Sequence, residues 1–84
     1  MLEVKILGSG CPNCKRLEAE TRAVLAESNI DYHLTKVTDY VDIVAHGVIQ
    51  TPALMINEVL LVQGRIPRRQ QISKWIYDSL ETAQ

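Results

Sequence analysis

A long helical pattern between two strand patterns is the feature that most constrains what this chain can fold into. From Leu2 to Leu7 apolar residues alternate with Glu and Lys before a final Leu, which predicts a strand. Apolar residues recur at helical spacing from about Cys11 to Ser28, and alternation returns from Ile30 to Val37. A strand, a long helix and a second strand in this order predict a βαβ unit, whose two parallel strands are joined by a right-handed crossover.

The middle of the chain predicts a short helix with a signal at each end. The helix is expected from Asp39 to His46. Thr38 can cap its start through a side-chain oxygen, and Gly47 can take the left-handed conformation that often follows a helix. Asn29 can end the long first helix in the same way.

The last third of the chain predicts a hairpin followed by a helix. Two short apolar runs, Ala53 to Ile56 and Val59 to Val62, flank the polar pair Asn57-Glu58. Pro67 can open a final helix, whose apolar stripe consists of Ile72, Trp75, Ile76 and Leu80. The resulting order, βαβαββα, predicts an α/β fold of three layers, with helices on both faces of a four-stranded mixed sheet.

Length and charge limit the classes of function. The 84 residues predict a single domain, residues 1–84. Nine basic and ten acidic residues give a net charge of −1, so we expect binding neither to nucleic acid nor to an anionic membrane. The chain has no long apolar stretch and enters a strand pattern directly after Met1. We therefore expect a cytoplasmic protein without a signal peptide.

The chemistry is indicated by the only two cysteines, Cys11 and Cys14, in the run GSGCPNCK. A helix N-terminus presents unpaired N–H groups and the positive end of the helix dipole, which both favour a thiolate. We therefore predict a lowered pKa for Cys11 and assign it as the nucleophile. Cys14, one helical turn later, can resolve a mixed disulfide formed by Cys11. Pro12 suits the first helical position, and the charge of Lys15 would support a thiolate.

The spacing of the cysteines alone is compatible with more than one kind of site. Two small buried residues without reactivity, or half of a metal site, fit the same pattern. Two soft thiolates suit Cu(I), whereas zinc would need a partner molecule or a histidine, and both His33 and His46 are expected at the surface. In a reducing cytosol a lone CxxC is more often catalytic or metal-binding than structural.

A second motif makes the pattern more specific. The run GVIQTPAL, which begins at Gly47, together with CPNC at a strand-to-helix junction, resembles the thioredoxin-like superfamily. The chain is most similar to the small archaeal and bacterial thioredoxin/glutaredoxin-like proteins called redox-active disulfide protein 2, from the first strand to the GRIP segment before the last helix. Small copper-chaperone domains share GxxCxxC, but their element order, βαββαβ, differs from the one predicted here.

The resemblance implies a thioredoxin-like fold of glutaredoxin size and a thiol-disulfide oxidoreductase that needs no bound cofactor. Pro52 matches the cis-proline that faces the CxxC in this superfamily, and Thr51 matches the residue whose backbone docks the substrate. Disulfides of proteins or small molecules would be the substrates of a monomeric protein, and an external reductase or thiol would supply electrons. A metal-binding (Cu/Zn) module and an adaptor with idle cysteines remain the alternatives.

Two departures from the superfamily pattern limit what can be carried over. Thioredoxins have an acid six residues before the first cysteine as proton acceptor for the resolving thiol, whereas this chain has Lys5. We expect another group or water, rather than Lys5, to take that proton. Glutaredoxins bind glutathione with cations and a glycine-rich turn before the last helix. The corresponding residues, Gly64, Arg65, Arg68 and Arg69, include a single glycine, so glutathione binding stays open.

Overall fold

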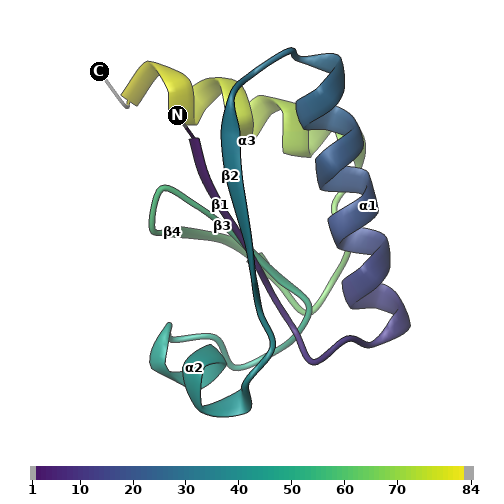
Figure 1. Cartoon of the computed structure of the whole chain (residues 1–84), viewed down its shortest axis with the longest axis vertical. Helices are drawn as coiled ribbons and strands as arrows, with labels where there is room; N and C mark the ends of the chain where they lie inside the picture. Colours follow the sequence, from purple (N-terminus) through teal and green to yellow (C-terminus); the bar gives the residue numbers. More distant parts are fainter. Residues whose placement is uncertain (1, 83–84) are drawn as a thin grey trace.

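Seven elements of secondary structure follow one another in the predicted order. The computed structural model describes residues 2–82 (Figure 1). The elements are β1 (Leu2–Leu7), α1 (Pro12–Glu27), β2 (Tyr32–Val37), α2 (Tyr40–Ala45), β3 (Ala53–Ile56), β4 (Val59–Gln63) and α3 (Arg69–Thr82). The predicted order βαβαββα is therefore confirmed.

The four strands form one mixed sheet in the order β2-β1-β3-β4. β1 and β2 are parallel and are connected through α1, as the βαβ prediction requires. β3 lies antiparallel to β1 with Ala53 opposite Leu7, and β4 lies antiparallel to β3. Because β1 ends where β3 begins, the loop after Leu7 and the residues before Ala53 meet at one end of the sheet.

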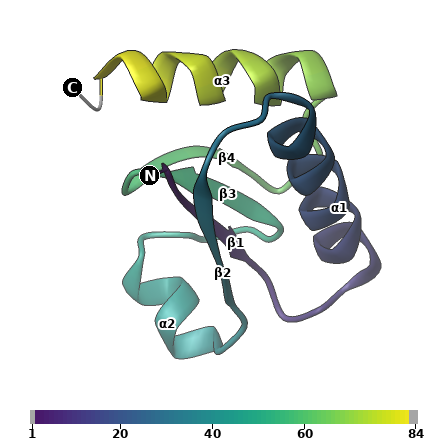
Figure 2. The same cartoon turned by 45° about the horizontal axis from the view of Figure 1, so that its top comes forward.

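Helices cover both faces of the sheet (Figure 2). α1 and α3 pack on one face, and the short α2 lies on the other (Figure 1). The core under α1 and α3 is formed by Leu2, Val4, Ile6, Leu17, Val24, Leu25, Leu54, Ile56, Val62, Ile72 and Ile76. The smaller core under α2 is formed by Leu7, Ile43, Val48, Ala53 and Met55. Along β1, Leu2, Val4 and Ile6 face the larger core, and Leu7 belongs to the smaller one.

The apolar stripe predicted for the last helix is the surface through which α3 packs. Ile72 and Ile76 are fully buried, and Trp75 and Leu80 pack against the same core. Burying one such isoleucine side chain contributes about 1.5–3 kcal/mol. This stripe therefore fixes α3 on the sheet and so determines where its first residues lie.

The ends of the two N-terminal helices follow local chemistry, with one difference from the prediction. Asn29 and Gly47 have φ angles of 53° and 82°, the left-handed conformation expected after a helix. Asp39, however, caps α2, and the prediction of Thr38 was wrong. The Asp39 carboxylate accepts a hydrogen bond from the backbone N–H of Val41 at 2.9 Å, which places the cap one residue later.

Other boundaries differ by two residues. β2 begins at Tyr32 rather than Ile30, and Tyr32 lies opposite Leu2, the first described residue of β1. The prediction that Pro67 opens the last helix was wrong, since α3 begins at Arg69. The carbonyl of Arg68 accepts the N–H groups of Gln71 and Ile72, so the first helical hydrogen bonds start after Pro67. The predicted turn Asn57-Glu58 does join β3 to β4, with φ angles of 50° and 67°. Left-handed residues at both positions match the twist of a two-residue hairpin.

Candidate active site

The first turn of α1 holds the Cys11 sulfur in a hydrogen bond. Cys11 is the N-cap of the helix, and its Sγ accepts a hydrogen bond from the backbone N–H of Cys14 at 3.1 Å. Its carbonyl accepts the N–H of Lys15 at 3.0 Å. Pro12 occupies the first helical position, where no N–H is needed. The donor and the helix dipole both favour negative charge on the Cys11 sulfur.

The two cysteines form a disulfide, with Cα atoms 5.0 Å apart. They differ in exposure: Cys14 is 5% exposed, whereas Cys11 is half-buried. A second molecule can therefore approach the Cys11 sulfur more readily than the Cys14 sulfur. The local geometry thus distinguishes an outer and an inner member of the pair.

Gly8 is a site residue that the sequence predictions missed. A Cβ atom built on Gly8 would overlap the Sγ of Cys14, and it would lie 3.9 Å from the Cα of Pro52. The absence of a side chain at Gly8 is therefore what makes room for the inner sulfur. Only a general signal was present in the sequence, since a glycine beside a strand can mark a close approach of another group.

Thr51 and Pro52 lie at the same end of the sheet as the disulfide. Pro52 is buried next to Gly8, its peptide bond with Thr51 is cis, and its carbonyl accepts the N–H of Gly64 at 2.9 Å. Thr51 is exposed. The structure therefore brings Cys14 and Pro52, 38 positions apart in the chain, to one site.

A groove of about 480 Å³ lies between Ser9, in the loop before Cys11, and Thr51. It is lined by Ser9, Tyr40, Ile43, Val44, Gly47, Val48, Ile49 and Thr51. Tyr40, Val44 and Ile49 are 77%, 51% and 84% exposed, so its walls present apolar side chains to solvent. Such apolar exposure beside a reactive site is typical of a surface that contacts another molecule.

A cavity of about 70 Å³ lies beside Cys14. Its walls include Lys15, Glu18 and Lys36, and Glu18 is the only carboxylate among the residues that line it. The Glu18 Oε1 lies 3.6 Å from the Nζ of Lys36. The cation predicted to support a thiolate, Lys15, therefore borders the inner cysteine. Glu18 and Lys36 were not anticipated from the sequence.

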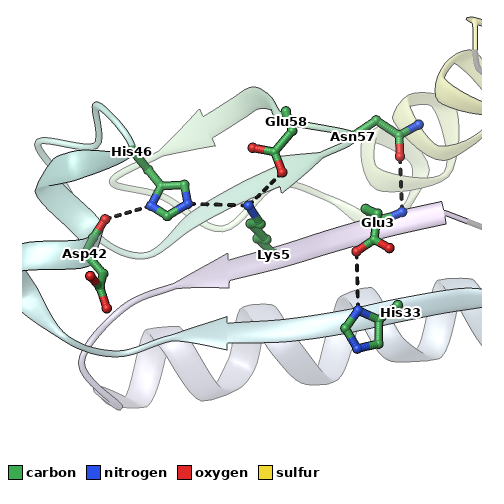
Figure 3. Close-up of polar contacts among 7 residues, drawn as sticks. All are labelled: Glu3, Lys5, His33, Asp42, His46, Asn57 and Glu58. Atoms are coloured by element: carbon green, nitrogen blue, oxygen red, sulfur yellow. Dashed lines mark hydrogen bonds and ion pairs between the residues drawn. The ribbon is translucent and has the colours of Figure 1, made fainter.

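Lys5 has partners on the α2 face of the sheet (Figure 3). Its Nζ donates a hydrogen bond to Glu58 Oε1 at 2.7 Å and lies 3.4 Å from His46 Nε2. The hydrogen bond and the charge of Lys5 lower the pKa of Glu58. His46 is partly buried, and its Nδ1 lies 2.7 Å from the carbonyl oxygen of Asp42. Lys5 is not among the residues that line the cavity at Cys14.

The basic residues near the last helix differ in their partners. Arg69 forms ion pairs with Glu20 and, at 3.7 Å, with Glu27, and its hydrogen bond lowers the pKa of Glu20. Arg65 and Arg68 are exposed and line a hollow of about 430 Å³ at the start of α3. Of the three arginines considered for an anion site, one is therefore already neutralised by the protein.

The described residues contain neither a cluster of metal ligands nor a helix suited to cross a membrane. Across residues 2–82, no three His, Cys, Asp or Glu side chains converge as a metal site would require. His33 lies exposed on the edge strand β2, with its Nδ1 3.3 Å from Glu3 Oε2. In the same range no helix combines the length and the apolar character that crossing a membrane demands.

An accessible sulfur at a helix N-terminus, with a second sulfur beneath it, suits reversible exchange of disulfides. The mixed sheet and the site at its end define the class as thioredoxin-like thiol-disulfide oxidoreductases. The family model described as "Thioredoxin domain" matches residues 2–77. The chain belongs to this thioredoxin family and is a thiol-disulfide oxidoreductase.

Two archaeal thioredoxins are similar along nearly their whole length. The chain is 32% identical over 81 residues to a thioredoxin of Methanocaldococcus jannaschii, and the aligned region covers 96% of this chain and 93% of that protein. It is 31% identical over 74 residues to a thioredoxin of Methanothermobacter thermautotrophicus, and the aligned region covers 88% of this chain and 96% of that protein. Among solved structures, glutaredoxin 1 of Francisella tularensis complexed with cacodylate covers 98% of this chain and 99% of its own, with 21% identity and a TM-score of 0.46.

Proposed function

We propose that Cys11 is the attacking thiol of this oxidoreductase and Cys14 the resolving thiol. The observation that carries the assignment is the difference between the two sulfurs. Cys11 is half-buried and accepts the Cys14 N–H at 3.1 Å, whereas Cys14 is 5% exposed. A thiolate needs both stabilisation and access to attack a second molecule, and only Cys11 has both.

In the reducing direction the Cys11 thiolate attacks one sulfur of a substrate disulfide. A mixed disulfide forms, and the other substrate sulfur leaves as a thiolate that takes up a proton. The Cys14 thiol then loses its proton and attacks the Cys11 sulfur of the mixed disulfide. The second substrate sulfur leaves, so that the substrate gains two electrons and two protons and the protein is left with the Cys11–Cys14 disulfide. An external reductase or thiol returns the pair to the dithiol.

The substrate chain is proposed to dock along Thr51 and Pro52. Thr51 is exposed beside the disulfide loop, and within residues 2–82 no hydrogen bond involves its backbone N–H or C=O. These groups can pair with an extended segment, as an unpaired strand edge does. The groove bordered by Tyr40, Val44 and Ile49 would receive an apolar side chain next to the substrate cysteine.

Thioredoxin family membership implies disulfide-containing substrates and a reductase partner in general. We further propose a monomer that consists of one domain over residues 1–84 and acts in the cytoplasm without a bound cofactor. The even balance of charge and the lack of a helix in residues 2–82 suited to span a membrane are compatible with that location. A reducing compartment would also keep the pair available for turnover.

Trapping of mixed disulfides tests the assignment of the two thiols. Cys14→Ser and Cys11→Ser are matched variants that each leave one thiol and abolish the internal disulfide. Incubated with a cystine-containing peptide, Cys14→Ser should accumulate the peptide on Cys11, as found by mass spectrometry, whereas Cys11→Ser should accumulate little. Equal trapping by both variants would contradict the roles. Tightly bound zinc or copper in the wild type without a reversible disulfide would instead favour metal binding.

A further inference from the structure

Three exposed arginines border the reactive end of the molecule. Arg16 lies on α1, five residues after Cys11, and Arg65 and Arg68 lie between β4 and α3. All three are exposed, and within residues 2–82 none of them forms an ion pair. We call Arg16, Arg65 and Arg68 the arginine arc.

Backbone packing places the arc beside the disulfide and the proposed docking edge. The N–H of Gly64 donates to the carbonyl of Pro52 at 2.9 Å, so Arg65 follows a residue bonded to that edge. A Cβ on Gly64 would collide with the side chain of Gln50, which precedes Thr51. The segment before α3 also runs alongside α1 (Figure 1), where Arg16, Pro67 and Arg68 line one hollow of about 370 Å³.

The charge of the arc stands out against the charge of the whole chain. The chain carries a net charge of −1, yet Arg68 shares one hollow with Arg16 and another with Arg65. The carboxylate that lines the first hollow, Glu20, is bound by Arg69 and is also close enough to Arg16 for the charge of Arg16 to lower its pKa. The neighbouring Arg69 differs from the arc, because Glu20 and Glu27 of α1 form ion pairs with it and so connect α1 to α3. The arc therefore offers positive charge and guanidinium donors for carboxylates of another molecule.

We propose that the arginine arc selects polypeptide substrates that carry Asp or Glu beside the disulfide to be reduced. This inference rests on the proposed docking along Thr51 and Pro52 and names the class of substrate that the same site prefers. A carboxylate-bearing segment that lies across Cys11 would meet Arg16 on one element and Arg65 and Arg68 on another. Charge complementarity of this kind raises the rate of association more than the final affinity, and it weakens with added salt.

The test uses three synthetic peptides that share one intramolecular disulfide and differ only in its two flanking residues, which are Glu, Gln or Lys. The reduced protein is mixed with each peptide, and the second-order rate constant of peptide reduction is measured by acid quenching and mass analysis. At low ionic strength the Glu peptide should react about 10-fold faster than the Lys peptide, with the Gln peptide between them. In about 0.5 M salt the difference should largely disappear, because screening lengths then fall to a few ångströms.

Variants of the arginines test whether the arc causes the preference for the Glu peptide. Arg65→Gln with Arg68→Gln should remove most of the preference, so that the rates with the Glu and the Gln peptide become similar. Arg22→Gln is the control for each single variant, Arg65→Gln and Arg68→Gln, because Arg22 is an exposed arginine of α1 that is paired with Glu18 at 2.9 Å and lines neither hollow at the arc. It removes one unit of positive charge away from the arc and should leave the preference intact.

Equal rates for the three peptides at low salt would overturn the proposal, as would a preference that survives in the arc variants. A third outcome is that only oxidised glutathione, tested in parallel, loses rate in these variants. That result would also overturn the proposal, because the arc would then serve a small thiol. Failure of the underlying redox function is distinguishable, since no peptide, including the neutral one, would then be reduced. Thermal unfolding of each variant verifies that it is folded.

Discussion

Replacing Gly8 by alanine tests whether the site is assembled as the structure shows it. The added Cβ would overlap the Sγ of Cys14 and reach within 3.9 Å of the Cα of Pro52. Both neighbours are buried, so neither can turn away into solvent. Insertion of a methyl group into a packed site typically costs about 1–3 kcal/mol. For a domain of this size that corresponds to a fall in Tm of roughly 5–20 °C.

The assay is thermal and urea unfolding under reducing conditions, so that loss of the disulfide does not enter the comparison. A double-mutant cycle assigns the cost to the sulfur: Gly8→Ala is measured in the wild type and in a Cys14→Ala background. Because Cys14→Ala removes the overlapping atom, the penalty of Gly8→Ala should shrink there by about 1 kcal/mol or more. A Gly8→Ala protein within about 0.5 kcal/mol of the wild type, or a penalty that is the same in both backgrounds, would refute the reasoning.

Three further predictions concern charge and packing. Lys5→Met should leave the alkylation rate of Cys11 unchanged, since Lys5 is bound to Glu58 and does not line the cavity at Cys14; a changed rate would return Lys5 to the mechanism. Glu58→Gln should make the protein lose less stability between neutral and acid pH. Lys5 lowers the pKa of Glu58 in the folded protein, so the ionised Glu58 stabilises the fold above its unfolded pKa of about 4.3. This stabilisation is lost as the pH falls through the lowered pKa of the folded state. Urea midpoints at pH 7 and pH 3 measure this, and parallel pH profiles of the two proteins would contradict it. Ile72→Ala should destabilise by about 2–5 kcal/mol because Ile72 is fully buried under α3, whereas Val59→Ala, at a residue 56% exposed, should stay within about 0.5 kcal/mol in the same urea experiment.

The order of the elements was predictable because each signal is local. Alternation over Leu2 to Leu7 and the apolar stripe that includes Ile72 depend on the immediate sequence, and tertiary structure only had to bury them. Errors occurred where two adjacent residues could do the same task. Thr38 and Asp39 are both good N-cap residues, and the backbone geometry that decides between them is set by the end of β2.

The candidate site was predictable where the motif itself is contiguous. Cys11 as N-cap and Pro12 as first helical residue follow from the run CPNC at a strand-to-helix junction. The place of Pro52 beside the cysteines depends on the pairing of β1 with β3, which only the resemblance to a known superfamily indicated.

The remaining site features arise from contacts between distant segments. The role of Gly8 depends on where the Cys14 sulfur lies after α1 has packed. The difference between Arg69, which forms ion pairs, and Arg68, which forms none within residues 2–82, depends on the approach of α1 to α3. No periodicity or spacing in the sequence encodes such contacts, so they could be recognised only in the folded chain.

Alkylation of the reduced protein tests the different roles of the two thiols most directly. The wild type is treated with a limiting amount of iodoacetamide between about pH 5 and pH 9, and peptide mass mapping identifies which cysteine is modified. Cys11 should be modified first at every pH, because it is more exposed than Cys14. Its midpoint should lie below the value of about 8.5 for a free thiol, because its sulfur accepts the Cys14 N–H at the N-terminus of α1. Preferential modification of Cys14, or a Cys11 midpoint at or above that of a free thiol, would contradict the assignment of Cys11 as the attacking group.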